Sequence, residues 1–183
     1  MIKKILLAVV IIVVVVVGAL AVIVALQPSH YRVERSTTIS APAATVFAQV
    51  NDFHKWEAWS PWAKLDPAMK QAYEGALAGN GAVYTWSGNS EVGEGRMTIT
   101  DSHPNDSIKI KLEFMKPFAA TNATDFTFTP QANQTNVKWT MSADNNFMGK
   151  AFGLFMNMDK MVGSDFEKGL AQMKAVAETA AKQ

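Results

Sequence analysis

Residues 107–114 read SIKIKLEF, and this stretch decides the fold class. Its apolar side chains occupy alternate positions, and charged side chains stand between them at Lys109, Lys111 and Glu113. Such alternation predicts a β-strand with one face buried and the other in water. This pattern is typical of an antiparallel sheet, because parallel sheets are usually covered on both faces.

Several neighbouring stretches repeat the same pattern. We expect strands at residues 32–39, 82–87, 94–101, 122–129 and 136–142, and the chain becomes strand-like from Gln71 onward. The sequence His103-Pro104-Asn105-Asp106 predicts a turn. Before most of these strands, residues 43–50 favour a helix with Val46, Phe47 and Val50 on one face.

The C-terminal segment changes to a helical period, with a possible break near Gly163. Its apolar stripe consists of Phe152, Phe155, Met156, Met161, Val162, Phe166, Leu170 and Met173. An apolar helix face must be buried, and the inner face of the sheet is the only partner large enough. We therefore predict an α+β fold in which a curved antiparallel sheet wraps around a long C-terminal helix.

The N-terminus carries a candidate membrane segment. No charged or strongly polar residue occurs between Ile5 and Leu26, and a helix over residues 5–26 would rise about 33 Å, close to the thickness of a bilayer core. The apolar run is longer than the core of a cleaved signal peptide, so we favour an uncleaved anchor over that alternative. Lys3 and Lys4 favour a cytoplasmic N-terminus. We thus expect a single-pass protein of the cytoplasmic (inner) membrane whose C-terminal domain is extracytoplasmic, divided into anchor (1–27), linker (28–31) and soluble domain (32–183).

Composition excludes several classes of function. Lys and Arg number 17 against 16 Asp and Glu, so there is no basic field to hold nucleic acid. The chain has no Cys, which rules out disulfides and thiolate chemistry. The three His have no ligand-like spacing, so we expect neither a metal site nor a cofactor.

Short motifs in a particular order resemble a known family. They are APAATVF (41–47), WEAWSPW (56–62), VGEG (92–95), the Pro104-Asn105 turn, TNVKW (135–139) and GSDFEKGL (163–170). Together they resemble the START-like, or SRPBCC, superfamily with the helix-grip fold, and within it the polyketide cyclase/dehydrase branch. The likeness covers about residues 31–180. It implies an apolar cavity between sheet and C-terminal helix, in proteins that bind lipids, sterols, polyketides or other hydrophobic molecules, and of which some are enzymes.

The stretch NDFHKWEAWSPW (51–62) holds three of the five Trp. Phe53, Trp56 and Trp59 are spaced by three, so a short helix would place them on one side. They would either plug the core at one end of the gap between sheet and helix or form the rim of a cavity. From alternation and helical period, we predict a ligand cavity lined by Trp56, Trp59, Tyr84, Trp86, Phe114, Trp139, Met156 and Met161.

The sequence supplies no compact catalytic set. There is no Gly-x-Ser-x-Gly elbow, and Gly93-Glu94-Gly95 opens a strand rather than a dinucleotide-binding helix. Glu94 shares a strand face with Arg96, which favours a solvated outer face, unless a bulge turns Glu94 into the cavity as an acid or base. His54, in the aromatic stretch, is the other weak catalytic candidate.

These observations favour a membrane-anchored protein that binds a hydrophobic small molecule or lipid without chemistry. Two alternatives remain open. One is a cyclase- or hydratase-like enzyme that uses Glu94, His54 or a tyrosine, and the other is a protein-interaction domain resembling the co-chaperone relatives of this fold. A filled interior would favour the interaction domain.

Overall fold

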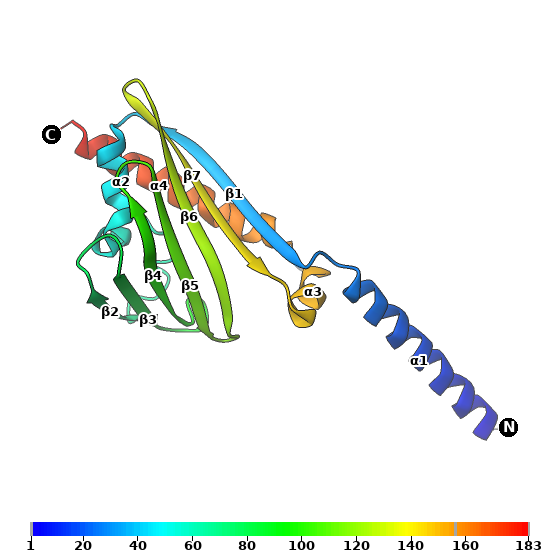
Figure 1. The fold of residues 1–183 in the computed structure, drawn as a ribbon. Helices are drawn as coiled ribbons and strands as arrows, with labels where there is room; N and C mark the ends of the chain where they lie inside the picture. The colour runs from blue at the N-terminus through cyan, green and yellow to red at the C-terminus, as the bar shows by residue number, and fades with distance from the viewer. Residues whose placement is uncertain (1, 156, 183) are drawn as a thin grey trace.

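The computed structural model describes residues 2–155 and 157–182, which form a seven-stranded antiparallel sheet with helices on one face (Figure 1). The strand order is β1-β7-β6-β5-β4-β3-β2. The strands are β1 (His30–Ile39), β2 (Lys70–Gly75), β3 (Ala82–Ser87), β4 (Glu94–His103), β5 (Ser107–Lys116), β6 (Ala120–Gln131) and β7 (Gln134–Asp144). The sequence-based prediction of an α+β fold is therefore confirmed.

Alternation of burial follows the predicted faces. Ile108 and Ile110 of β5 are buried, whereas Lys109 and Lys111 between them are exposed. Several strands run about two residues beyond their predicted ends, because backbone pairing continues through polar residues that carry no alternation signal. Thus β6 and β7 remain paired as far as Gln131 and Gln134.

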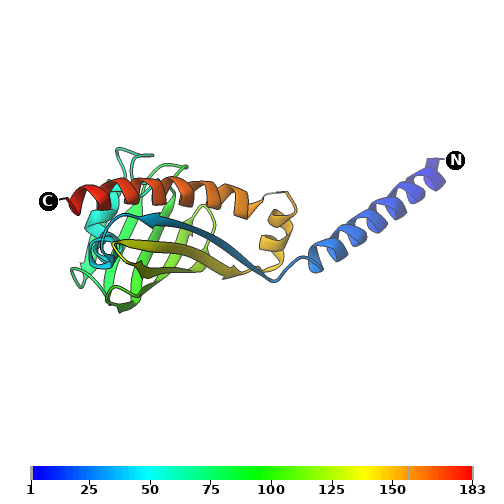
Figure 2. The ribbon, with the colours of Figure 1, turned by 90° about the horizontal axis from the view of Figure 1, so that it is seen from above.

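The long helix α4 (Met158–Ala180) lies across the concave face of the sheet, as Figure 2 shows. Its residues Phe166, Leu170, Met173 and Ala177 are buried against the strands. One end of the layer between sheet and helix is closed by α2 (Ala43–Asn51), whose Phe47 ring meets Phe128 of β6 edge-on at 5.4 Å. The 3₁₀ helix η1 (Phe53–Ala58) follows α2 directly and continues that closure.

The break in the C-terminal segment does not lie at Gly163, and this expectation was wrong. A separate short helix, α3 (Phe147–Gly153), precedes α4, and Gly163 lies within α4. The glycine lets the Arg35 guanidinium of β1 lie directly against α4, where a Cβ would displace it. Phe152 and Phe155 belong to the predicted buried stripe, but they are exposed, on α3 and just after it.

The N-terminal helix α1 (Ile2–Ala25) extends away from the sheet at the end where α3 lies (Figures 1 and 2). By length and composition it is the one helix in the described part of the chain that is able to cross a membrane. Its apolar side chains are exposed along nearly its whole length. One apolar N-terminal helix of this kind fits either a membrane anchor or a signal sequence.

Candidate functional site

A cavity of about 320 Å³ lies between the sheet and the first turns of α4. Its position follows from the strand register. Met141 of β7 pairs with Thr124 of β6, and Leu112 of β5 pairs with Met97 of β4, so these lining residues lie together on the inner face of four neighbouring strands. Whereas α2 closes one end of the fold, the cavity occupies the half of the sheet nearest to α1.

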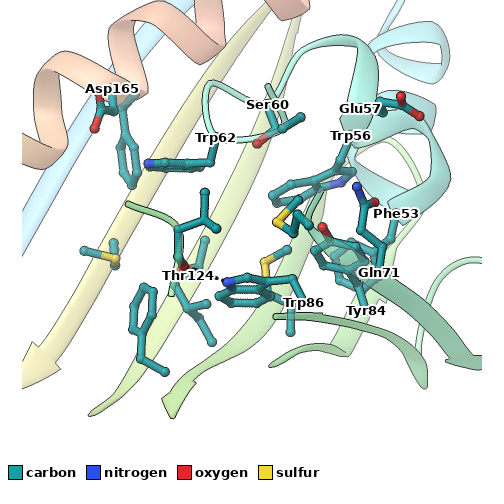
Figure 3. Close-up of a pocket in the computed structure, with 18 of the residues that line it drawn as sticks. Phe53, Trp56, Glu57, Ser60, Trp62, Gln71, Tyr84, Trp86, Thr124 and Asp165 are labelled. Atoms are coloured by element: carbon teal, nitrogen blue, oxygen red, sulfur yellow. Dashed lines mark hydrogen bonds between the residues drawn. The ribbon is translucent and has the colours of Figure 1, made fainter. Parts of the chain in front are cut away.

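Aromatic rings form a large part of the cavity wall. The Trp139 ring stacks on Phe166 of α4 with centroids 3.9 Å apart, and Trp86 stacks on Tyr84 at 5.8 Å. Figure 3 shows the side chains of η1 and β3 converging on the same space from two directions. Stacked and edge-on ring pairs of this kind make a stiff wall with a large apolar surface.

The aromatic stretch before Pro61 both plugs the core and lines the cavity. Phe53 and Trp56 are nearly buried and still border the cavity. The indole of Trp56 donates a hydrogen bond to the carbonyl oxygen of Val50 at 3.0 Å, which fixes the ring against α2. The two interpretations of this stretch are therefore compatible, because one face of a ring seals the core and the other faces the space beside it.

Most of the residues that we predicted for the cavity wall do border it: Trp56, Tyr84, Trp86, Phe114, Trp139 and Met161. Trp59 does not. It is fully buried behind Trp56, and its indole donates to the carbonyl oxygen of Gln49 at 3.0 Å. Met156 lies outside the described residues. Contact of any of these residues with a ligand stays a prediction.

Sequence reasoning missed several lining residues. Val162 and Phe166 belong to the predicted helical stripe, and Leu112 to the alternating face of β5, so their period was the available signal. No such signal pointed to Trp62, since it follows the turn at Pro61, where period carries no information. Only the folded chain brings Trp62 within 5.9 Å of the Trp139 ring.

The two weak catalytic candidates do not border the cavity. A register shift does occur between Glu94 and Gly95, but the Glu94 carboxylate pairs with Lys116 at 2.7 Å. The hydrogen bond from Lys116 to Glu94 raises the pKa of that lysine. His54 bonds Asp52 at 2.9 Å and stacks on Tyr73 at 4.0 Å. The bulge thus does not turn Glu94 inward, because the exposed ammonium of Lys116 pairs with the Glu94 carboxylate.

The rim of the cavity carries negative charge. The charged side chains that border it are all carboxylates, namely Glu57 of η1, Glu91 of the β3–β4 loop and Asp165 of α4. Figure 3 shows Glu57 and Asp165 on different sides of the cavity. Lys168 pairs with Asp165 at 2.9 Å and offsets one of these charges.

Two tyrosines also border the cavity, the half-buried Tyr84 and the more exposed Tyr73. Burial raises the pKa of Tyr84 to about 12, and the negative charge of Glu57 contributes to the shift. Burial and Glu57 raise the pKa of Tyr73 as well. Both phenols therefore stay protonated at neutral pH, and they offer hydrogen bonds rather than a base. Among the described residues, no three His, Asp or Glu side chains gather as metal ligands would.

Two polar atoms of cavity-lining residues are buried without a partner among the described residues. They are the hydroxyl oxygen of Thr124 and the indole nitrogen of Trp139. A buried hydroxyl or N–H without a hydrogen bond destabilises a protein by about 1–3 kcal/mol. This part of the interior is therefore less stable than a fully paired or fully apolar one.

Comparisons with known proteins agree with this architecture. Residues 30–178 match the family described as "Polyketide cyclase / dehydrase and lipid transport". No curated protein sequence matches the chain at a significant level.

Solved structures show the same fold at low sequence identity. SA2116 from Staphylococcus aureus, a protein of unknown function, superposes with a TM-score of 0.63 and 13% identity, over 84% of this chain and 97% of that one. CV1439 from Chromobacterium violaceum gives 0.57 and 14%, over 83% and 99%. The di-domain ARO/CYC StfQ from the steffimycin biosynthetic pathway gives 0.60 and 13%, over 84% of this chain and 52% of StfQ. With the sheet, the gripped helix and a family match over most of its length, this chain belongs to the polyketide cyclase/dehydrase and lipid transport family of the START-like, helix-grip superfamily.

Proposed function

We propose that the protein is a membrane-tethered binding protein for a neutral hydrophobic small molecule or lipid. The observation that carries the proposal is the aromatic cavity of about 320 Å³ beneath α4. The description of its family includes lipid transport, and apolar walls with a few polar groups are typical of sites for such ligands. An open interior also weighs against a purely protein-interacting domain.

The size of the cavity limits the ligand. Sites for small molecules span about 300–1,000 Å³, so this one stands at the small end of the range. It suits a molecule of a few fused rings, or one apolar chain of a lipid. A ligand of this size would rest on the Trp86 and Trp139 rings, which offer flat apolar surfaces.

The charge of the rim favours a neutral ligand. No Lys, Arg or His borders the cavity within the described part of the chain, whereas three carboxylates do. An anionic headgroup there would meet like charges with no cation inside the cavity to offset them. Neutral alcohols, ketones or esters fit better, because protonated Tyr84 can donate a hydrogen bond to them.

The helix α1 would act as the tether. Its length of about 36 Å suits a bilayer core, and its exposed apolar surface has no other partner among the described residues. With Lys3 and Lys4 in the cytoplasm, the folded part would lie on the far side of the inner membrane. A tether makes sense for a ligand that partitions into lipid, since the domain then meets it at high local concentration.

Native mass spectrometry of the full chain, released gently from its membrane into lipid nanodiscs, tests whether a ligand is present. We expect a neutral molecule to co-purify with the protein and to be detected by its mass. It should be lost from a Leu112→Trp variant, whose larger side chain fills the cavity. A Leu77→Trp variant is the matched control, because Leu77 is 84% exposed at the β2–β3 turn, away from the cavity. Circular dichroism verifies that both variants fold. Equal recovery of the molecule from both variants would show that it does not bind in the cavity, and the proposal would be wrong.

Two dyes with the same ring system test the charge preference. N-phenyl-1-naphthylamine is neutral, and 8-anilinonaphthalene-1-sulfonate adds one sulfonate. Energy transfer from the cavity tryptophans reports binding of each dye. We expect the neutral dye to bind at concentrations at least about tenfold lower than the sulfonate dye, which is a difference of ~1.4 kcal/mol in binding free energy. Empty nanodiscs give the background from dye in lipid. Equal affinities, or tighter binding of the sulfonate, would refute the neutral-ligand assignment.

A cyclase- or dehydrase-like reaction is the second candidate, and the rim carboxylates Glu57 and Asp165 favour it as acid or base groups. It differs from simple binding in one measurable way. A ligand incubated with the protein would be recovered with changed mass or ring connectivity, and Glu57→Gln or Asp165→Asn would abolish that change while leaving binding intact.

A further inference from the structure

Outside α1, large exposed apolar side chains gather at one end of the fold. Six of them form what we call the apolar end: Met115, Phe118, Phe147, Met148, Phe152 and Phe155. They come from the end of β5, the β5–β6 turn and the α3 region. The Phe118 and Phe152 rings lie 5.8 Å apart, so the two segments meet. Phe155 is 86% exposed and Phe118 is 69% exposed, which is unusual for side chains of this size.

The apolar end lies beside the point where α1 joins the fold. Only residues 26–29 separate α1 from β1, and four residues span at most about 14 Å. The Lys150 ammonium of α3 donates to the carbonyl oxygen of Ala25 at 3.1 Å, at the last turn of α1. Figure 2 shows α3 next to that end of α1. Any membrane that holds α1 therefore lies within a few residues of the apolar end.

The apolar end lies beside the mouth of the cavity. Met161 borders the cavity and is also 46% exposed, and it follows the α3 region along the chain. On the opposite side, Phe114 lines the cavity near the end of β5, four residues before Phe118 of the apolar end, whereas Met115 points to the other face of the strand. The cavity mouth and the apolar end thus lie at the same end of the fold.

We propose that the apolar end docks on the surface of the bilayer and lays the cavity mouth against it. This proposal rests on the tether assigned to α1. Phenyl rings and methionines enter the boundary between headgroups and acyl chains, and the Lys150 ammonium lies at headgroup level. A hydrophobic ligand then passes between bilayer and cavity without crossing water. A lipid surface fits better than a protein partner, because the chain connectivity places lipid at this surface whenever α1 is inserted.

A chain without cysteine allows single labels to test this surface in the complete protein. Phe118→Cys and Phe155→Cys, each labelled with the polarity-sensitive dye NBD, would be reconstituted through α1 into phosphatidylcholine nanodiscs. We expect blue-shifted emission, quenching by nitroxide attached to lipid chains and protection from iodide in water. Leu77→Cys is the matched control, because it is equally exposed and apolar but lies away from α1. It should be quenched by iodide alone.

A label at Val13→Cys, in the middle of α1, separates failure of the docking surface from failure of the tether. If Val13 is in lipid while positions 118 and 155 are open to iodide, the docking proposal is wrong and the tether stands. If Val13 is not in lipid, both are wrong. Labels at 118 and 155 that are protected from iodide yet insensitive to lipid nitroxide would mean that a second copy or another protein covers this surface, which also overturns the proposal.

Ligand transfer gives a functional readout of the same surface. In a Phe118→Glu, Phe155→Glu double variant, we expect N-phenyl-1-naphthylamine to pass from vesicles to the protein at least about tenfold more slowly, with unchanged equilibrium affinity. A Leu77→Glu variant should transfer at the normal rate. An unaltered rate in the double variant would contradict entry from the bilayer.

Discussion

At the scale of single residues, the unusual feature is unpaired polar atoms inside an apolar wall. The Thr124 hydroxyl and the Trp139 indole N–H are both buried, and neither has a partner among the described residues. By contrast, the buried hydroxyl of Thr135 donates to the carbonyl oxygen of Ala41 at 2.9 Å. Two threonines on the inner face of neighbouring strands thus differ in whether their hydroxyls are satisfied.

This difference predicts opposite effects of the same substitution. Thr124→Val should raise the free energy of unfolding by about 1 kcal/mol, because it removes an unsatisfied buried hydroxyl and conserves the shape. Thr135→Val should lower it by a similar amount, because it leaves the Ala41 carbonyl without its donor. Chemical denaturation of the two variants measures both changes. Destabilisation by Thr124→Val would show that its hydroxyl does find a partner.

Tyr84 should be the last tyrosine to ionise. Burial raises its pKa to about 12, compared with an ordinary value of 10.0. Because the folded-state pKa is the higher one, the stability that it contributes is complete below pH 10 and is lost as the pH rises through about 12. Phenolate absorbance measured against pH should show a late transition that is missing from Tyr84→Phe. Retention of that transition in the variant would assign it to another tyrosine.

At the scale of elements, close contacts hold the cavity walls in place. The Gly95 backbone of β4 lies under the Trp86 indole, whose N–H donates to the carbonyl oxygen of Val92 at 2.9 Å. A Cβ at position 95 would collide with the Trp86 ring and would lie 2.6 Å from the carbonyl oxygen of Glu113. Neither the ring nor the backbone is free to move away.

We therefore expect Gly95→Ala to destabilise the fold by about 1–3 kcal/mol and to weaken dye binding by displacing the Trp86 indole. The control is Gly153→Ala in α3, where a Cβ meets no atom within 4 Å. That change should be neutral or slightly stabilising, since alanine favours helix. Denaturation and N-phenyl-1-naphthylamine titration measure the two effects. Full dye affinity in Gly95→Ala would show that the position of Trp86 does not matter for binding.

A second contact between elements holds the start of α4 on β1. The Arg35 guanidinium bonds the Asp159 carboxylate at 2.9 Å and that of Glu167 at 2.7 Å. These bonds span the helix turn that carries Met161 and Val162, which line the cavity. We call this set of bonds, from Arg35 to Asp159 and Glu167, the clamp. The clamp positions one side of the cavity mouth.

The clamp should loosen in acid. The Arg35 hydrogen bonds hold the pKa of Asp159 below its ordinary value of 3.8. Stability from this lowered pKa is present above pH 3.8 and is lost as the pH falls through the folded-state value. Amide exchange at the start of α4 should therefore become faster relative to the rest of the helix in strong acid. Arg35→Gln should produce the same relative change at neutral pH, and an unchanged pattern in that variant would argue against the clamp.

At the scale of the whole molecule, orientation in the membrane is the main prediction. Lys3 and Lys4 lie in the first turn of α1, ahead of its apolar run, and Arg32 and Arg35 follow α1. The lysines favour a cytoplasmic N-terminus, and we give them more weight than the two arginines because they stand at the end of the chain that begins the span. An alkaline phosphatase fused to the C-terminus should thus be active in cells. Inactivity of that fusion, with activity of a cytoplasmic reporter at the same site, would reverse the orientation.

Periodicity accounts for much of what the sequence predicted. Alternation along residues 107–114 and the helical stripe through Phe166, Leu170 and Met173 report which faces are buried, because burial repeats with the local geometry. The sheet, the gripped helix and most of the predicted cavity wall followed from these periods and from the family resemblance. The same reasoning failed for Trp59, since period identifies a buried ring without telling whether it faces a cavity or the core behind it.

The sequence by itself determined the α+β arrangement of a sheet around a long helix, the apolar N-terminal helix and the aromatic character of the interior, because all three are encoded in local hydrophobic patterns. Only the tertiary structure decided the rest. It paired Glu94 with Lys116, gathered carboxylates from three elements at one rim, and brought the β5–β6 turn against α3 beside α1. The physical reason is that charge pairing and surface juxtaposition join residues far apart in the chain, and no local pattern records such distances.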